Sequence, residues 1–298
     1  MFDQSSRLAP LHRRKTSSRG AVTFGPVSNL EEHVPSDWWR RVFNSVYLKT
    51  DGDVVCDHQI TCKEVDLFSE ILKMSRENKI LDLCCGQGRH SLELARRGFL
   101  SVEGLDRSHY LIQRAKMQAR KEFLNVRFRE GDARKLPYSA DSFDIVMILG
   151  NSFGYFATIQ EDIRVVQEVF RVLRAGGRIL IDVADGAYLQ QHFQPRSWEW
   201  LDRKHFVCRE RSLSCDQQRL ISREIVNDVR KGIIVDQFYA ERIYTRESMS
   251  ELLKIIGFND VIFHGEISPD SLRNQDLGMM GRRIIVTALA QKDRHTKG

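Results

Sequence analysis

The sequence predicts an α/β fold in which a seven-stranded, mostly parallel sheet carries an antiparallel β insertion after its fifth strand. Three observations predict this architecture. Apolar strand segments alternate with helical segments between residues 79 and 184, a pattern typical of parallel strands joined by right-handed crossovers. The first of these strands ends in a glycine-rich turn. Residues 197–244 instead alternate with a period near two, which predicts an antiparallel meander.

The turn after the first strand, within residues 79–91, is the most informative stretch. A short apolar strand containing Asp82 leads through a Gly-x-Gly turn, Gly86 and Gly88, into a helix that begins near Arg89. Because the two glycines have no Cβ, the backbone can approach a ligand closely, and the free N–H groups of the helix point at that ligand. The third glycine of a dinucleotide-binding turn is absent. A carboxylate before the turn would repel a diphosphate, so the cationic S-adenosylmethionine fits better.

Two further carboxylates follow strand segments. Asp106 ends the second strand about 20 residues after the glycines, where it can accept hydrogen bonds from ribose hydroxyls. Asp132 follows the third strand. The ligand of a parallel sheet lies at the carboxyl ends of its strands, which is where these side chains are expected. Each aspartate alone could be a helix cap or a turn residue, but three in succession favour a binding role.

The other elements follow from the same patterns. Predicted strands cover residues 99–105, 126–130, 143–149, 178–184, 261–265 and 282–289, and predicted helices cover residues 62–74, 108–122, 159–174 and 246–256. Ser108 is a suitable N-cap for the helix that follows it. The Gly176-Gly177 pair ends the helix before the fifth strand.

Together these motifs resemble the class I S-adenosylmethionine-dependent methyltransferases, whose first motif runs D/E-x-G-x-G-x-G. Asp82, Gly86 and Gly88 match it, whereas Cys84 replaces the first glycine. The resemblance covers about residues 36–290 and implies a Rossmann-like sheet, S-adenosylmethionine as the cofactor and, for the Asp after the third strand, a contact with adenine. The residues expected to bind the cofactor are Asp82, Cys84, Gly86, Gly88, Asp106, Arg107, Asp132, Ala133, Gly150 and Tyr47.

Composition divides the chain into three parts. Residues 1–35 have few large apolar side chains and predict a disordered basic tail. Residues 1–20 hold five basic residues against one acidic residue, a net charge of +4 out of +6 for the 298-residue chain. The methyltransferase domain is expected at 36–290, and 291–298 form a C-terminal tail.

Two segments are expected to flank the acceptor site. Residues 37–48 place apolar side chains at helical spacing and predict a helix that serves as a lid, with Tyr47 near the methionine end of the cofactor. The insertion, at about residues 188–245, resembles the β-cap of small-molecule N- and O-methyltransferases, which roofs the acceptor pocket or builds a dimer contact. Its alternating Arg and Glu residues suit cross-strand ion pairs at least as well as substrate recognition.

Methyl transfer needs mainly the positioning of nucleophile, carbon and sulfur, so no residue is singled out as catalytic. Aromatic faces near the sulfonium help, and Phe153 and Tyr155 in the loop after the fourth strand are suitably placed. His205 is a candidate base by location only. The residues expected to contact the acceptor are Asn151, Tyr155, His205, Arg223 and Tyr239.

Charge and composition limit the partners. Outside the tail the chain is nearly neutral, which argues against a nucleic-acid surface, and no apolar run is long enough for a membrane span. The six scattered cysteines and the absence of a secretory leader indicate a soluble, cytoplasmic protein, although the Arg- and Ser-rich N-terminus also suits a mitochondrial presequence. Cys56, His58 and Cys62 have no usual zinc spacing, so no metal is expected.

These observations predict S-adenosylmethionine-dependent methyl transfer to a nitrogen or oxygen of a small molecule. The loop at Asn151 lacks the proline motif of methyltransferases that act on exocyclic amines of nucleobases. The alternatives are a methyltransferase acting on protein or RNA, for which the basic tail is the positive sign, and a cofactor-binding scaffold without catalysis. A homodimer built through the cap is also compatible with the sequence.

Overall fold

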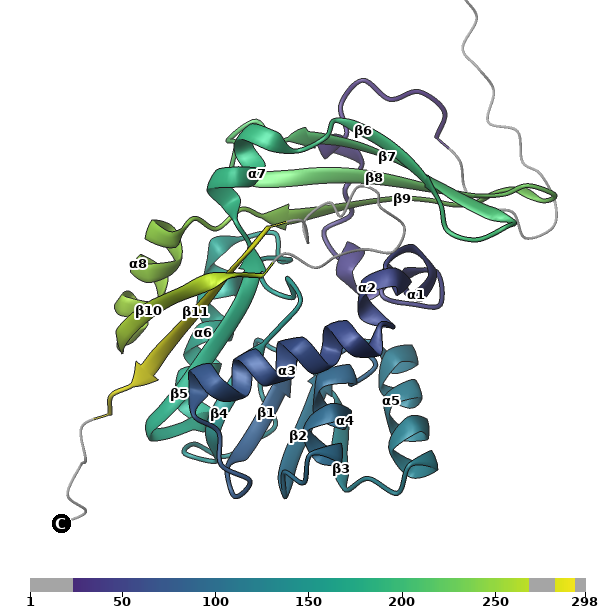
Figure 1. Ribbon diagram of the computed structural model, residues 1–298. Coiled ribbons are helices and arrows are strands. Elements are labelled where there is room, and N and C mark those ends of the chain that lie inside the picture. Colours follow the sequence, from purple (N-terminus) through teal and green to yellow (C-terminus); the bar gives the residue numbers. More distant parts are fainter. Residues whose placement is uncertain (1–23, 268–281, 293–298) are drawn as a thin grey trace, which may run out of the picture.

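The computed structural model describes residues 24–267 and 282–292. Its centre is a seven-stranded sheet in the order β10-β11-β5-β4-β1-β2-β3, in which β1 to β5 run parallel while β11 is antiparallel to β5 and β10 antiparallel to β11 (Figure 1). The strands are β1 (Lys79–Leu83), β2 (Ser101–Asp106), β3 (Val126–Glu130), β4 (Phe143–Ile148), β5 (Leu173–Ala184), β10 (Phe258–Ile267) and β11 (Arg283–Ala290). The predicted fold class is therefore confirmed.

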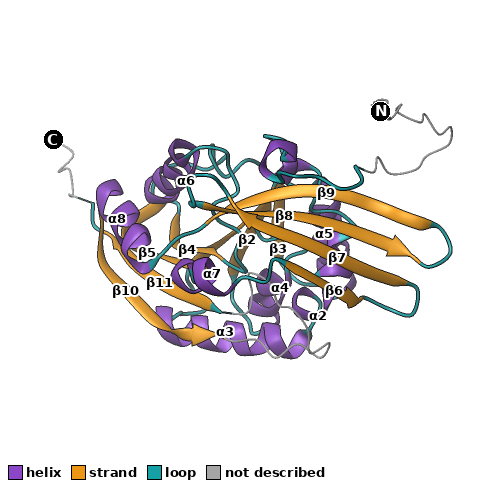
Figure 2. Cartoon of the chain, turned by 90° about the horizontal axis from the view of Figure 1, so that it is seen from above, coloured by secondary structure: helices purple, strands orange, loops and turns teal. Residues whose placement is uncertain are grey.

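Helices cover both faces of this sheet (Figure 2). They are α3 (His58–Leu72), α4 (Arg89–Arg96), α5 (His109–Lys121), α6 (Ile159–Val172), α7 (Gly186–His192) and α8 (Arg246–Ile256). Phe68 of α3 packs in the core on one face of the sheet, and Met249 of α8 packs in the core on the other. The predicted N-cap is confirmed, because the Ser108 hydroxyl accepts the Leu111 N–H at 3.2 Å.

The insertion forms a separate four-stranded antiparallel sheet, which we call the cap. Its strands are β6 (Arg196–Trp200), β7 (His205–Leu213), β8 (Arg219–Asp228) and β9 (Gly232–Arg242), hydrogen-bonded in that order. The cap lies over the carboxyl edge of the central sheet (Figure 1). Its attachment includes Asp162 of α6, which accepts hydrogen bonds from Arg242 Nε at 2.9 Å and from the Tyr244 hydroxyl at 2.8 Å.

The predicted single lid helix at 37–48 is wrong. The chain forms η2 (Trp38–Arg40) and α1 (Tyr47–Thr50), with turns between them, and then α2 (Gly52–Val55). The Asn44 side chain accepts the Val46 N–H at 2.7 Å and donates to the Arg41 carbonyl at 2.6 Å, so local side-chain bonds replace helical ones. These short pieces nevertheless lie between the cap and the sheet edge (Figure 1).

The predicted end of the tail, at residue 35, is too late. From residue 24 onward the chain packs on the outer face of the cap and forms η1 (Glu31–His33). Leu30 packs against Phe238, and the Phe24 N–H donates to Asp236 Oδ2 at 2.9 Å. Residues 1–23 and 293–298 lie outside the described part of the chain.

Some element boundaries also differ from prediction. β5 begins at Leu173, before the Gly176-Gly177 pair that was expected to separate helix and strand, so α6 passes directly into β5. α3 begins four residues earlier than predicted because Asp57 caps it by accepting the Ile60 N–H at 2.9 Å. Within the described residues, no helix combines the length and apolar character needed to cross a membrane.

Candidate active site

The turn between β1 and α4 holds three residues in left-handed backbone conformation. Cys84 has φ 61°, Gly86 has φ 57° and Gly88 has φ 76°. A Cβ at Gly88 would lie 2.6 Å from the Phe128 ring, so this glycine lets α4 pack closely against β3. The Cys85 N–H donates to the Leu105 carbonyl at 3.1 Å, which fastens the turn to β2.

Asp106, the last residue of β2, is bonded to that turn. Its Oδ2 accepts the Gly86 N–H at 2.8 Å and its Oδ1 accepts the Ser108 N–H at 2.7 Å. Burial raises the pKa of this carboxyl above its ordinary value, whereas the backbone N–H donors lower it. The carboxylate is thereby held in one orientation beside the turn.

A cavity, which we call the turn pocket, opens above these residues. Its walls are largely apolar, and two carboxylates are among the lining side chains. The lining residues include Tyr47, Cys84, Gly86, Leu105, Asp106, Arg107, Leu111, Asp132, Ala133, Phe153, Tyr155 and Phe156. Some of the hydrogen-bonding capacity of Asp132 is already used, because both its carboxylate oxygens accept hydrogen bonds from Arg134 at 2.6–2.9 Å.

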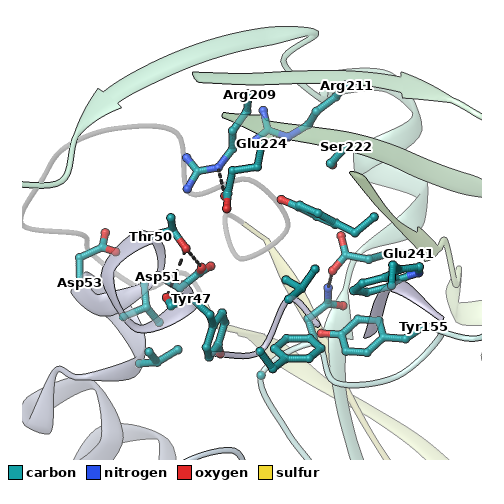
Figure 3. A pocket seen from close by; sticks show the side chains of 18 of the residues that line it. Tyr47, Thr50, Asp51, Asp53, Tyr155, Arg209, Arg211, Ser222, Glu224 and Glu241 are labelled. Atoms are coloured by element: carbon teal, nitrogen blue, oxygen red, sulfur yellow. Dashed lines mark hydrogen bonds and ion pairs between the residues drawn. The ribbon is translucent and has the colours of Figure 1, made fainter. Parts of the chain in front are cut away.

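A second cavity, the cap cavity, lies between the cap and the segments η2, α1 and α2 (Figure 3). It encloses about 970 Å³ including its open mouth. The inward side chains of β6 to β9 form its roof, α1 and α2 form one wall, and the loop after β4 forms the other. The charged and polar lining residues include Thr50, Asp51, Asp53, Asn151, Glu199, Arg209, Arg211, Ser222, Glu224, Tyr239 and Glu241.

Three aromatic side chains line both cavities and form a partition between them. Phe43 stacks on Tyr155 with ring centroids 5.4 Å apart, and Tyr47 meets Phe43 edge-on at 5.2 Å. Trp38 lies on the cap side of Tyr155, with the two ring centroids 5.1 Å apart. A molecule in the turn pocket and another in the cap cavity would therefore meet at this aromatic partition.

Comparison with known proteins identifies the family. Residues 80–177 match the family model described as a methyltransferase domain. They include the turn, Asp106 and Asp132, whose arrangement has just been described. Residues 80–177 form the methyltransferase domain of an S-adenosylmethionine-dependent enzyme. S-adenosylmethionine is its cofactor.

Relatives and solved structures agree with this family. YqeM of Bacillus subtilis is a protein that is expected to be a methyltransferase. It is 28% identical over 188 residues, which cover 62% of this chain and 75% of YqeM. The chain spans 40–46% of the length of three other curated methyltransferases that it matches. A methyltransferase structure from Clostridium acetobutylicum has a TM-score of 0.65 at 18% identity, covering 83% of this chain and 97% of that one. CalS10 of Micromonospora echinaspora, an amino pentose methyltransferase solved with S-adenosylmethionine, has a TM-score of 0.56 at 19% identity, with the same coverage.

The roof of the methyltransferase's cap cavity contains a buried ion-pair network. Arg209 donates from Nη1 to Glu199 at 2.6 Å and from Nε to Glu224 at 3.2 Å. Gln237 also donates to Glu224 at 3.0 Å. Arg209 and Glu224 are thus held by each other and by their neighbours, which stabilises the shape of the roof (Figure 3).

Glu241 and Asn151 connect the cap to the loop after β4. Asn151 Oδ1 accepts the Ala184 N–H at 3.0 Å, and its Nδ2 donates to Glu241 Oε1 at 3.2 Å. No described residue donates a hydrogen bond to the buried Oε2 atom of Glu241. Burial, and then the nearby Asp51, raise the pKa of Glu241 to about 8.

A buried charge cluster supports the same loop from below. Arg283 of β11, which is fully buried, donates to Glu64 and to Asp182, each at 2.6 Å. Asp182 Oδ2 also accepts the Gly150 N–H at 2.9 Å, while Arg89 donates to Glu64. The cluster therefore links α3, α4, β5 and β11 to the start of the loop that holds Asn151.

Most residues predicted to bind the cofactor line a cavity. Cys84, Gly86, Asp106, Arg107, Asp132 and Ala133 line the turn pocket, Gly150 lines the cap cavity, and Tyr47 lines both. Two do not line either cavity. Gly88 packs on Phe128, and Asp82 lies buried beneath the turn, where its Oδ2 accepts the Ser91 hydroxyl at 2.6 Å. Burial raises the pKa of Asp82 to about 6.

Of the predicted acceptor contacts, Asn151, Tyr155 and Tyr239 line the cap cavity, but two residues require correction. Arg223 was expected on the inward face, yet it points outward, where it donates to Asp236 at 2.8 Å. The strand register explains this, because Arg223 pairs with Phe238 whereas Ser222 pairs with Tyr239. His205 lies outside the cavity lining, between Asp202 and Asp228.

Three potential metal ligands come together between α3 and α4. Cys62 Sγ lies 3.6 Å from His58 Nε2 and 3.5 Å from Glu93 Oε1. Both Glu93 oxygens already accept hydrogen bonds from guanidinium groups, at 2.8 Å from Arg97 and at 3.2 Å from Arg96. The Glu93 charge is therefore compensated within the protein, and we assign no metal to this cluster.

Sequence reasoning missed Glu241, Asp51, Arg209 and Arg211 as cavity residues. The alternation within β9 held a signal, because Tyr239 was predicted to face inward and Glu241, two residues later, must share its face. The side chains that oppose them in β8 depend on the register, which the alternation does not reveal. Asp51 lies between the helices predicted at 37–48 and 62–74, so its position could not be inferred from either.

Proposed function

We propose that this enzyme transfers the methyl group of S-adenosylmethionine to a nitrogen or oxygen of a small molecule that occupies the cap cavity. The observation that carries this proposal is the wall shared by the two cavities. Phe43, Tyr47 and Tyr155 line both, so the reacting ends of cofactor and acceptor can meet there. Methyl transfer requires this kind of end-to-end alignment more than it requires a reactive side chain.

The turn pocket suits the adenosyl part of the cofactor. Asp106 keeps lone pairs for the ribose hydroxyls while its other contacts fix its orientation. Leu105, Leu111 and Ala133 offer an apolar slot for the adenine ring, and Asp132 lines the same pocket. When bound, the cofactor supplies an electrophilic methyl group on a positively charged sulfur. We assign the binding residues on this chemical fit.

The aromatic partition suits the sulfonium. The faces of Tyr155, Phe43 and Tyr47 offer electron density to a cation without competing as nucleophiles. Burial raises the pKa of Tyr47 and of Tyr155 above the ordinary value of tyrosine, so both hydroxyls stay protonated at neutral pH. These residues would position and shield the methyl group rather than remove a proton.

The enclosure of the cap cavity favours a small acceptor. Its lining side chains come from all four cap strands, from α1 and α2, and from the loop after β4. The cap covers the cavity from above, whereas a protein or RNA substrate would need an open path for its chain (Figure 3). CalS10, which shares the fold, is an amino pentose methyltransferase, and this also supports a small-molecule acceptor.

The test is an untargeted assay in which an isotopically labelled methyl donor is incubated with the enzyme and a metabolite extract. We expect label in a low-molecular-weight product detected by mass spectrometry. Ser222→Leu, which adds bulk to the cavity roof, should abolish the product while S-adenosylhomocysteine still binds. Cys208→Leu adds similar bulk to the outer face of the same sheet and serves as the matched control.

Label that appears only in the protein or RNA fraction would instead assign a macromolecular acceptor. Binding of S-adenosylmethionine without labelling of any fraction would assign a scaffold without catalysis. Both outcomes contradict the proposal. Equal loss of product in the two leucine variants would contradict the location of the acceptor in the cap cavity.

A further inference from the structure

Glu241 is a carboxyl group that the protein buries but does not fully satisfy. The residue is 8% exposed, and it lines the cap cavity. Asn151 donates to Oε1, whereas Oε2 receives no hydrogen bond from any described residue. A buried polar oxygen without a hydrogen-bond partner destabilises the protein, and a ligand that pairs with Oε2 would offset this cost.

Asn151, in the loop after β4, fixes the orientation of the Glu241 side chain. Asn151 cannot turn its amide around, because its Oδ1 is held by the Ala184 N–H at 3.0 Å and only its Nδ2 is left for Glu241. Asn151 directly follows Gly150, which also lines the cavity. Tyr155, part of the aromatic partition, is close enough for Glu241 to raise its pKa. The free oxygen therefore belongs to the end of the cavity where methyl transfer is proposed.

Other acidic and basic groups around Glu241 define what can bind it. Asp51 of the α1–α2 junction raises the pKa of Glu241, while Arg211 and Arg219 lower it less than burial raises it. Among the tyrosines, burial raises the pKa of Tyr239 and of Tyr155, so neither can act as a base near neutral pH. The carboxyl groups of Glu241 and Asp51 both line the cavity, and together they favour the binding of a cationic ligand.

We propose that Glu241 binds the amino group of the acceptor as an ammonium and takes one proton from it, so that the substrates of this enzyme are amines. This inference rests on the proposed function. In the step, an N–H bond of the ammonium breaks and an O–H bond forms at Oε2. The products are a neutral amine, whose lone pair is the nucleophile for methyl transfer, and a neutral carboxylic acid. The carboxyl keeps this proton when the methylated ammonium product leaves, and one proton goes to solvent when the next ammonium pairs with it.

The proton affinities match this role. A base works best when its pKa lies near the operating pH, and that of Glu241 is raised to about 8. An ordinary exposed carboxylate is too weak a base to deprotonate an ammonium. A buried ammonium–carboxylate pair is costly, so burial favours proton transfer to the neutral pair.

The binding test uses three matched probe pairs, namely cyclohexylamine with cyclohexanol, benzylamine with benzyl alcohol, and phenethylamine with phenethyl alcohol. Each is titrated into the full-length protein saturated with S-adenosylhomocysteine. Wild type should bind the amines at least about tenfold more tightly than the alcohols. Glu241→Gln should lose this preference, and Glu210→Gln, a carboxylate on the outer face of the cap, should keep it. Failure of all three amines to bind wild type, or an unchanged preference in Glu241→Gln, overturns the proposal.

A measurement on wild type alone covers the case in which Glu241→Gln does not fold. Calorimetry of benzylamine binding at pH 6.5 in buffers of different ionisation enthalpy counts the protons released. We expect about one per amine bound, because the protonated carboxyl and the ammonium together lose one proton when they pair. No release overturns the proposal. In the labelling assay, an O-methylated product would refute this inference and leave the proposed function standing, whereas the absence of any labelled product would refute the proposed function.

Discussion

Asp106 accepts the backbone N–H of Gly86 at 2.8 Å across 20 residues of sequence. This bond joins the end of β2 to the turn after β1, which are neighbours only because the two strands pair in parallel. The carboxylate thus supports the turn and remains in the wall of the turn pocket. The Asp106 side chain therefore holds the turn to the neighbouring strand and also makes the proposed contact with the cofactor.

Replacing Asp106 should therefore weaken cofactor binding more than it affects folding. For Asp106→Ala we expect a loss of about 2–4 kcal/mol, or about 30- to 1000-fold in Kd, because charged hydrogen bonds are worth roughly 1.5–3 kcal/mol each. Asp106→Asn keeps one acceptor oxygen, so its Kd should lie between those of wild type and Asp106→Ala. Isothermal titration with S-adenosylhomocysteine measures both, and Asp66→Ala, an exposed carboxylate outside both cavities, is the control. An unchanged Kd in folded Asp106→Ala would mean that Asp106 only supports the turn.

Two glycines with the same backbone angle separate packing from backbone strain. Gly88 and Gly176 both have φ 76°, but a Cβ at Gly88 would overlap the Phe128 ring while one at Gly176 would meet nothing within 4 Å. Gly176→Ala should cost about 1 kcal/mol of unfolding free energy from the left-handed conformation alone. Gly88→Ala should cost about 2–4 kcal/mol, since overpacking adds about 1–3 kcal/mol.

Urea denaturation of the two alanine variants checks this difference at constant m-value. Adding Phe128→Leu to Gly88→Ala should restore part of the loss, because the smaller side chain vacates the overlap. Equal destabilisation at the two glycines would show that α4 shifts away from β3 without cost. That result would contradict the view that Gly88 serves packing.

The sheet and the turn could be predicted because their signals are local. Strand alternation with helices, a Gly-x-Gly turn and aspartates at strand ends are each readable over a few residues, and together they allow few topologies. The segment around Trp38 shows where this fails. Its apolar spacing fits a helix, but the Asn44 side-chain bonds and the burial of both Trp38 and Trp39 against different neighbours favour shorter pieces. Tertiary packing overrode periodicity.

The acceptor site was less predictable because it depends on register. Each cap strand shows which residues share a face, yet which face is inward follows from pairing with strands far along the chain. Arg223 was placed inward and Glu241 overlooked for that reason. Arg283 shows a second limit, since its partners Glu64 and Asp182 are 219 and 101 residues away in sequence. No local sequence pattern predicts a buried ion pair between residues so far apart in the chain.

The Arg283 cluster gives a strong stability prediction. Arg283→Met leaves Glu64 and Asp182 buried without their shared guanidinium and should cost about 3–5 kcal/mol of unfolding free energy. The loss should shrink in acid, where the two carboxyls can protonate. Arg127→Met removes an exposed partner of Glu103 and should cost below about 1 kcal/mol. Similar losses in the two variants, by chemical denaturation at pH 7, would contradict a structural role for the cluster.

The last prediction concerns how stability depends on pH through Glu241. Its pKa is about 8 in the folded protein and 4.5 as the ordinary value, so the folded state binds the proton more tightly than the unfolded chain does. Ionisation therefore costs folding free energy. Between about pH 4.5 and pH 8, wild type should lose stability relative to Glu241→Gln by up to about 1.4 kcal/mol per pH unit, and the difference should level off above pH 8.

Thermal and urea unfolding of both proteins at several pH values measure this difference. Glu210→Gln controls for the loss of a carboxylate elsewhere on the cap. Parallel pH profiles for wild type and Glu241→Gln would mean that Glu241 ionises as freely as an exposed side chain. In that case Glu241 would carry its charge before any ligand arrives, so amine binding at neutral pH would release no proton from it. The stability profile therefore tests the protonation state on which the proton-transfer step depends, with no knowledge of the acceptor.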